Sequence, residues 1–140
     1  MTDEIDALQL TLTSEHAAVF VLGYLGAQTS VSAQPDLFQA VSDAYAAHRG
    51  RRDHVAAAVR DLGSQPVAAE PAYQLPEVSR EPAAISAAAL SVERACGTAY
   101  GVLLASAEGS GRRWALEVLI DSAVRELAFG GEPRAFPGRT

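Results

Sequence analysis

Hydrophobic positions recur along this chain with gaps of three and four residues, the period of a helix that buries one face. No stretch has the strict alternation of a β-strand. The pattern therefore predicts an all-α protein with four helices, at about residues 3–28, 35–62, 82–107 and 111–129.

Residues that favour helix ends lie at the bounds of these segments. Pro35 and Pro82 suit a first helical turn, and Gly63 suits the end of the second helix. We expect Thr2 to cap the first helix and Ser110 to cap the fourth.

The connections predict how the helices are arranged. Short loops make hairpins of the first two helices and of the last two. Between the hairpins, residues 64–81 contain three prolines, which favour extended backbone. A segment of this length reaches roughly 60 Å, whereas a helix of about 26 residues is roughly 40 Å long.

The linker can therefore run the length of the bundle, and one long crossover between two hairpins is the ferritin-like topology. We predict one domain, residues 1–140, folded as an all-α, ferritin-like up-down four-helix bundle. Its long crossover joins the second and third helices, and residues 130–140 form an irregular tail. The alternative is a plain up-down bundle with a loose middle loop.

An ionisable residue lies on the apolar stripe near the middle of each predicted helix. These residues are Glu15, His48, Glu93 and Asp121. If the helices are aligned end to end, the four side chains meet at one level of the bundle interior. Carboxylate and imidazole ligands suit a single divalent metal such as iron, manganese or zinc, so these four residues are the candidate metal site.

The same level departs from the carboxylate-bridged di-iron pattern, which takes a Glu from each of two helices and a Glu-x-x-His from each of the other two. Tyr45 replaces the expected glutamate in the second helix. In the fourth helix, Val118 stands at the glutamate position and Asp121 at the histidine position.

Arginines one turn away offer a second interpretation. Arg52 and Arg125, together with a protonated His48, can balance the charges of Glu15, Glu93 and Asp121 without a metal. Unpaired buried charges cost several kcal/mol each, so a self-neutralised polar layer with Arg52, Arg125 and Tyr45 as partners is the leading hypothesis. The direction of the Arg52 and Arg125 side chains distinguishes the metal site from the self-neutralised layer. If both guanidinium groups point into the layer, they take the place of a metal. If both point outward, the carboxylates need a cation.

Composition excludes several classes of function. The net charge of −6 disfavours nucleic-acid binding. Cys96 is the only cysteine, so no internal disulfide forms, and its place on the third stripe favours a small core residue. The N-terminus lacks the features of a signal peptide, and no apolar run reaches the ~18 residues of a membrane span. We therefore expect a cytoplasmic protein that does not bind membranes.

Four stretches resemble a family of small ferritin-like proteins from actinobacteria whose function is unknown. They are "LTSEHAAVF" (12–20), "AHRGRRD" (47–53), "PVAAEPAYQLP" (66–76) and "AFPG" (135–138). The resemblance covers nearly the whole chain. It implies a ferritin-like four-helix bundle, paired as a homodimer, with no established activity.

Three functions remain open from the sequence. The first is a non-catalytic structural or interaction module that binds no cofactor and forms a homodimer. The second is a metal-binding ferritin-like protein, including an oxidase. The third is a module that binds a small ligand in a cavity among its alanine-rich helices.

Overall fold

The computed structural model describes residues 3–139 and contains four α-helices. Their bounds differ from the predicted ones by at most two residues, and the described residues form no strand. The all-α prediction is therefore confirmed. The helices are α1 (Glu4–Gln28), α2 (Pro35–Asp61), α3 (Pro82–Ser106) and α4 (Gly109–Ala128).

The helix ends agree only in part with the predicted signals. Pro35 and Pro82 are the first residues of α2 and α3. Asp3 caps α1, since its side chain accepts a hydrogen bond from the Asp6 amide at 2.8 Å. The predicted cap Thr2 lies outside the described residues.

The prediction of Ser110 as the cap of α4 was wrong. The helix begins at Gly109, one residue earlier, so Ser110 lies inside its first turn. Glu108 occupies the N-cap position and makes no capping hydrogen bond with its side chain. Gly109 has a φ of +56°, a left-handed backbone conformation that favours glycine.

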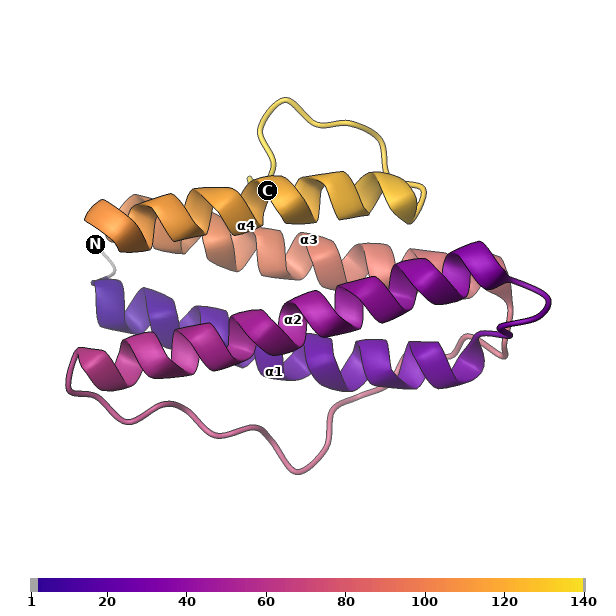
Figure 1. Ribbon diagram of the computed structural model, residues 1–140, viewed down its shortest axis with the longest axis horizontal. Coiled ribbons are helices and arrows are strands. Elements are labelled where there is room, and N and C mark those ends of the chain that lie inside the picture. Colours follow the sequence, from indigo (N-terminus) through magenta and orange to yellow (C-terminus); the bar gives the residue numbers. More distant parts are fainter. Residues whose placement is uncertain (1–2, 140) are drawn as a thin grey trace.

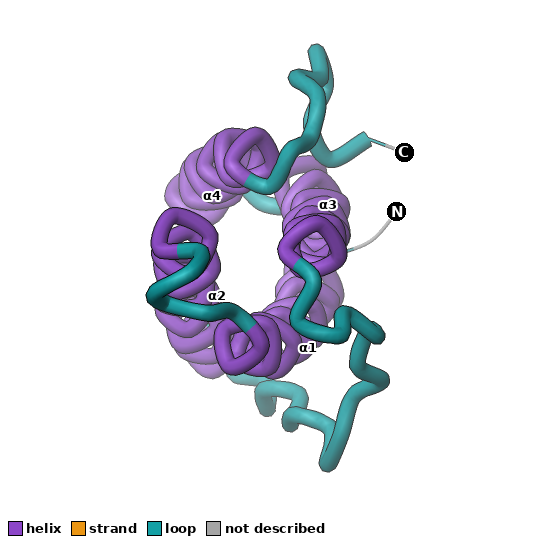
Figure 2. The backbone as a smooth tube through the Cα atoms, turned by 90° about the vertical axis from the view of Figure 1, so that its right-hand side faces the viewer, coloured by secondary structure: helices purple, strands orange, loops and turns teal. Residues whose placement is uncertain are grey.

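The four helices surround one interior (Figures 1 and 2). α1 lies beside α2, α3 lies beside α4, and α1 also packs against α3. Residues 62–81 leave the end of α2 and run along the outside of the bundle to the start of α3 (Figure 1). The starts of α1 and α4 and the ends of α2 and α3 therefore lie at the same end of the bundle.

Side chains of α1 hold this linker against the bundle. The Gln9 amide donates to the Gln65 carbonyl at 2.7 Å and accepts from the Val67 amide at 2.9 Å. His16 Nε2 lies 3.0 Å from the Val67 carbonyl oxygen. Further along, the rings of Phe20 and Tyr73 are 5.3 Å apart.

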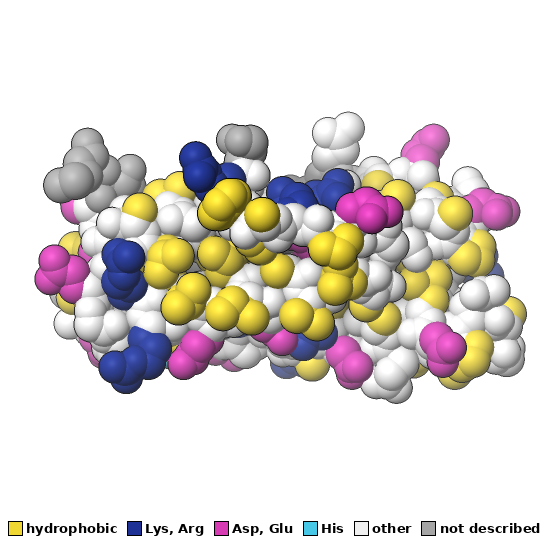
Figure 3. All heavy atoms as spheres, turned by 90° about the horizontal axis from the view of Figure 1, so that it is seen from above, with side chains coloured by type: hydrophobic (Ala, Val, Ile, Leu, Met, Phe, Trp, Pro, Cys, Tyr) yellow, Lys and Arg dark blue, Asp and Glu magenta, His cyan; other side chains and the backbone are white. Residues whose placement is uncertain are grey.

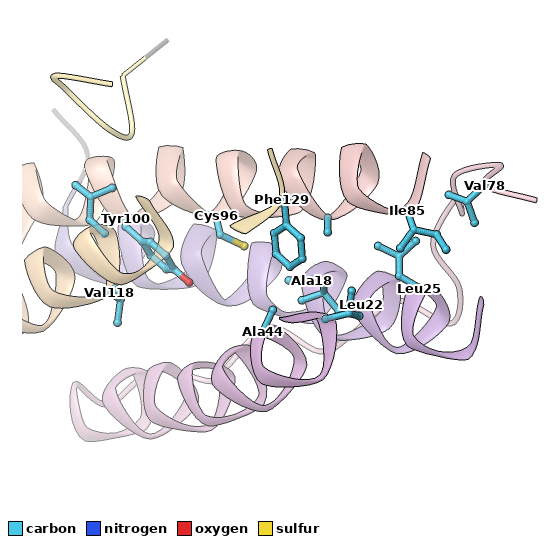
Figure 4. Packing of buried hydrophobic residues seen from close by; sticks show 13 residues of the cluster. Ala18, Leu22, Leu25, Ala44, Val78, Ile85, Cys96, Tyr100, Val118 and Phe129 are labelled. Atoms are coloured by element: carbon cyan, nitrogen blue, oxygen red, sulfur yellow. The ribbon is translucent and has the colours of Figure 1, made fainter. Parts of the chain in front are cut away.

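The interior contains two apolar clusters. The larger one fills the half of the bundle that holds the start of α3, and Figure 4 shows part of it, from Val78 and Ile85 to Cys96 and Tyr100. The smaller cluster lies at the other end and includes Leu8, Leu12, Val55, Val59 and Leu103. Buried polar residues lie between the two clusters.

The C-terminal segment folds back onto α3 and α4. The carboxylate of Glu126 is almost fully buried and binds the Arg134 guanidinium at 2.9 and 3.1 Å. Gly138 has a φ of +80° and lies so close to α3 that a Cβ atom there would be 2.6 Å from the Gly97 carbonyl oxygen. Only glycine fits this approach without displacement of α3.

Among the described residues, every helix lacks the long apolar run that a membrane crossing requires.

Candidate functional site

Glu15 of α1, His48 of α2 and Glu93 of α3 meet at the middle of the bundle, and each is 0% exposed. His48 Nδ1 lies 2.7 Å from Glu15 Oε2, and His48 Nε2 lies 2.8 Å from Glu93 Oε1. An ionised carboxylate only accepts hydrogen bonds. Both ring nitrogens therefore donate when the two glutamates are ionised, and His48 is then an imidazolium.

The environment of His48 favours this protonated form. Burial by itself lowers the pKa of His48, but interactions with Cys96, Glu15 and Glu93 raise it by more. The pKa of His48 therefore lies well above the ordinary value for histidine. The imidazolium bridges two carboxylates that would otherwise repel each other in the protein interior.

Two hydroxyl groups satisfy the remaining carboxylate oxygens. The Tyr100 hydroxyl donates to Glu15 Oε1, and the Ser122 hydroxyl donates to Glu93 Oε2 at 2.8 Å. Burial and the negative charge of Glu15 raise the pKa of Tyr100, so its hydroxyl stays protonated as a donor.

Arg51 of α2 supplies the second positive charge. Its Nη1 donates to the Tyr100 hydroxyl at 3.2 Å and to the Ser122 hydroxyl at 3.0 Å. Its Nη2 donates to Asp121 of α4. Arg51 therefore joins the buried hydrogen bonds to a partly exposed ion pair at the edge of the bundle.

The outer end of this network is the pair of Asp121 and Arg125, whose Nε lies 2.8 Å from Asp121 Oδ2. Partial burial raises the pKa of Asp121, but Arg125 and Arg51 lower it by more, so this pKa lies below its ordinary value. The side chain of Asp121 is 44% exposed, which places it outside the buried layer.

The predicted layer is thus corrected in α2 and α4. Arg52 points outward and pairs with the exposed Asp53 at 3.0 Å. Tyr45 is only partly buried and makes no hydrogen bond to the glutamates, while Arg49 lies over its ring. Asp121 and Arg125 pair with each other instead of entering the layer.

The physical reason is that helical spacing permits either of two neighbouring stripes. In α2, positions 48, 51, 55 and 59 are buried, and they fit gaps of three and four as well as 48, 52, 55 and 59 do. In α4 the buried stripe contains Ser122 instead of Asp121. Arg51 finds acceptors on α3 and α4, which the sequence pattern of α2 does not show.

The sequence interpretation missed Arg51, Tyr100 and Ser122 as members of the layer. Tyr100 follows Glu93 by seven residues, which places both on one face of α3, and a buried phenol needs a hydrogen-bond partner. That signal was available. No comparable signal selected Arg51 over Arg52, or Ser122 over Asp121.

Cys96 adds a possible ligand atom to this site. A carboxylate oxygen of Glu15, a ring nitrogen of His48 and Cys96 Sγ all lie within 4.8 Å of one another. This mixture of oxygen, nitrogen and sulfur donors fits a zinc ion. Burial raises the pKa of the Cys96 thiol, and the thiol donates a long hydrogen bond to the Ser14 carbonyl at 3.8 Å.

The charged and polar side chains of the layer find their ion-pair and hydrogen-bond partners within the protein. His48 pairs with both Glu15 and Glu93, while Arg51 and Arg125 both pair with Asp121. Every buried nitrogen and oxygen atom of the side chains within residues 3–139 has a hydrogen-bond partner.

Comparison with known proteins places the chain in a family. A family model described as "Domain of unknown function (DUF4439)" matches residues 7–140. The chain belongs to this family. No curated protein matches this member of the DUF4439 family.

Among solved structures, this DUF4439 chain is similar to a conserved hypothetical protein, Rv2844, from Mycobacterium tuberculosis. The two are 29% identical, with a TM-score of 0.82, and the match covers 91% of this chain and 94% of that chain. Neither description names an activity. The function of this DUF4439 member therefore has to be inferred from its own geometry.

Proposed function

We propose that this protein is a non-catalytic, ferritin-like interaction module that assembles as a homodimer. In this proposal the polar layer at its centre is a self-neutralised structural element. The ferritin-like assignment is supported by two helical hairpins and by a linker, residues 62–81, that follows the bundle along its outside (Figure 1).

The observation that carries the non-catalytic assignment is the closure of the polar layer. The oxygen atoms of Glu15 and Glu93 are engaged by His48, Tyr100 and Ser122. A reactive group or ligand site usually keeps an unsatisfied or accessible atom. Here such atoms are occupied by protein partners, and Arg51 occupies the space between α2 and α4.

The dimer is supported by an exposed apolar face of α4. Leu116, Ile120, Val124 and Leu127 follow gaps of four, four and three residues, so they lie on one side of the helix. Each is between 46% and 60% exposed. Apolar side chains gather in the middle of the molecule when it is viewed from the side of α4 and the C-terminal segment (Figure 3).

Large contiguous apolar patches on a protein surface mark interaction sites. Two copies that bring the same face of α4 together would bury this patch with a symmetric contact, the commonest arrangement in homodimers. The exposed face of α4 therefore supports the interaction role, whereas the buried polar layer supports the absence of catalysis.

A metal-binding protein is the second candidate, favoured by the approach of Glu15, His48 and Cys96. Glu93 does not join this set, because it faces the other ring nitrogen of His48, Nε2, while Glu15 faces Nδ1. A bound metal would have to replace the hydrogen bonds of His48, whose ring nitrogens both face carboxylates. Metal binding would also require the thiol to lose its proton, which its raised pKa opposes.

Metal content separates the two candidates. The protein is purified without an affinity tag or chelator, incubated with Fe(II), Mn(II) or Zn(II), and its metal content is measured by elemental analysis. We expect no stoichiometric metal, because His48, Tyr100 and Ser122 already engage the oxygen atoms of both buried glutamates. About one metal per chain, lost in Glu15→Ala and Cys96→Ala but kept in Asp53→Asn, would establish the metal site instead.

A further inference from the structure

A cleft lined by residues of all four helices opens at one end of the bundle. At this end α1 and α4 begin and α2 ends, as Figure 1 shows. Its volume is about 470 Å³, within the range of about 300–1,000 Å³ common for small-molecule sites. It lies away from the layer of Glu15, His48 and Glu93, and none of these three residues lines it.

The inner wall of the cleft is apolar. Leu8 of α1, Ala58 of α2 and Leu103 of α3 line it, and Leu8 and Leu103 are almost fully buried. Trp114 of α4 adds a large aromatic surface, which is partly exposed. The exposed His54 ring stacks on the indole at 4.5 Å, with the two planes 14° apart.

Carboxylates dominate the rim of the cleft. Glu4, Asp61 and Glu117 provide three negative charges against the single permanent positive charge of Arg113. None of these four groups belongs to an ion pair within residues 3–139. The rim therefore has an excess of negative charge that the described residues leave unbalanced.

The carboxylate of Glu4 lies close to the backbone of α4. Glu4 reaches from α1 to the first turn of α4, where a Cβ atom at Gly111 would lie 2.9 Å from its Oε1. A side chain at position 111 would therefore displace the carboxylate. Asp61 and Glu117 are exposed and remain free to approach a ligand.

We propose that this cleft binds a small organic cation, an ammonium group attached to a short apolar body. The apolar body would lie against Leu8, Ala58 and Leu103, while the ammonium would face Asp61 and Glu117. An aromatic ring such as that of Trp114 attracts cations in addition to its apolar contacts. The negative rim disfavours an anionic ligand.

The proposal can be tested with hexylammonium and two probes of similar length, hexanol and hexanoate. Binding is measured by calorimetry and by the fluorescence of Trp114, the only tryptophan of the chain. We expect saturable binding of hexylammonium, with affinities at least about tenfold weaker for the neutral and anionic probes. Higher salt should weaken the binding of the cation, because exposed charges are screened.

Two sets of variants assign the binding to the cleft. Asp61→Asn combined with Glu117→Gln should weaken hexylammonium binding by about tenfold or more and leave hexanol binding unchanged. Glu132→Gln removes an exposed carboxylate outside the cleft and should have no effect.

Three results would overturn the proposal. They are no heat or saturable signal with hexylammonium, equal affinity for hexanol, and unchanged cation binding in the Asp61→Asn/Glu117→Gln variant. Since none of these variants changes the buried polar layer or the four apolar residues of the α4 face, failure here would leave the proposed interaction function intact.

Discussion

At the scale of single residues, His48 decides the electrostatics of the interior. It lies between two fully buried carboxylates, each of which accepts a hydrogen bond from one of its ring nitrogens. Loss of its proton would leave the ring with one N–H group, so His48 could donate to only one of the two glutamates. The protonation of His48 is therefore coupled to folding.

This coupling predicts that stability falls at mildly alkaline pH. The folded state keeps the proton of His48 above the ordinary histidine pKa of about 6.5, where the unfolded chain has lost it. The stabilisation is complete below that pH and disappears as the pH rises through the higher pKa of the folded state. Between pH 6.5 and 8, we expect the free energy of unfolding to fall by up to about 1.4 kcal/mol per pH unit.

Chemical denaturation across this pH range measures the effect. In His48→Gln the slope attributable to His48 should vanish, whereas His54→Gln, which changes an exposed histidine, should retain it. The range ends at pH 8 because the unfolded Cys96 and Tyr100 ionise above it, and their raised folded pKa values add to the alkaline loss. A wild-type slope in His48→Gln would contradict the role of His48.

Glu93→Gln tests the same layer from the side of the carboxylate. The change leaves His48 and Ser122 opposite an amide and removes one charge from a buried network. We expect a loss of roughly 3 kcal/mol in the free energy of unfolding, the scale of a broken buried pair. The exposed Glu132→Gln is the matched control, and an unchanged denaturation curve for Glu93→Gln would contradict the closed network.

At the scale of elements, the C-terminal segment behaves as part of the bundle. Its contact with α4 is the ion pair between Glu126 and Arg134, and its contact with α3 is the close approach of Gly138 to Gly97. Glu126 is buried on α4, so its charge depends on this segment for a partner. Arg94 lies farther away, with its Nε 3.6 Å from Glu126 Oε2.

Arg134→Gln should therefore destabilise the protein although residue 134 is exposed. The substitution removes both short hydrogen bonds to Glu126 and leaves Arg94 as its charged partner. We expect a loss of about 1.5–3 kcal/mol, typical of hydrogen bonds to charged groups, measured by urea denaturation. Arg139→Gln changes a nearby arginine that does not bind Glu126, and an equal loss in both variants would exclude a specific role for Arg134.

At the scale of the whole molecule, the exposed face of α4 should determine assembly. Ile120→Asp combined with Val124→Asp places two charges on the proposed contact, where their burial would cost several kcal/mol. We expect the wild type to sediment as a dimer and the variant as a monomer with unchanged helix content. Leu10→Asp is the control, because Leu10 is similarly exposed but lies on α1; a monomeric wild type would refute the dimer.

Much of the fold could be predicted from the sequence because local signals agreed. Gaps of three and four residues identified four helices, and Pro35 and Pro82 marked two of their starts. In the buried layer of the structure, Glu15, His48 and Glu93 lie together. Each interrupts an apolar stripe near the middle of its helix, so the same periodicity that defined the helix also placed these side chains inside.

The sequence by itself determined the helices and the presence of charged groups in their shared interior, because both follow from spacing within one segment. Only the tertiary structure decided which residues complete that interior. Helical spacing does not fix the rotation of α2 and α4 about their own axes to within one residue position. This rotation decides whether Arg51 or Arg52, and whether Ser122 or Asp121, faces the interior. The choice depends on hydrogen-bond partners on other helices, chiefly Tyr100 and Glu93 of α3, which no local pattern contains.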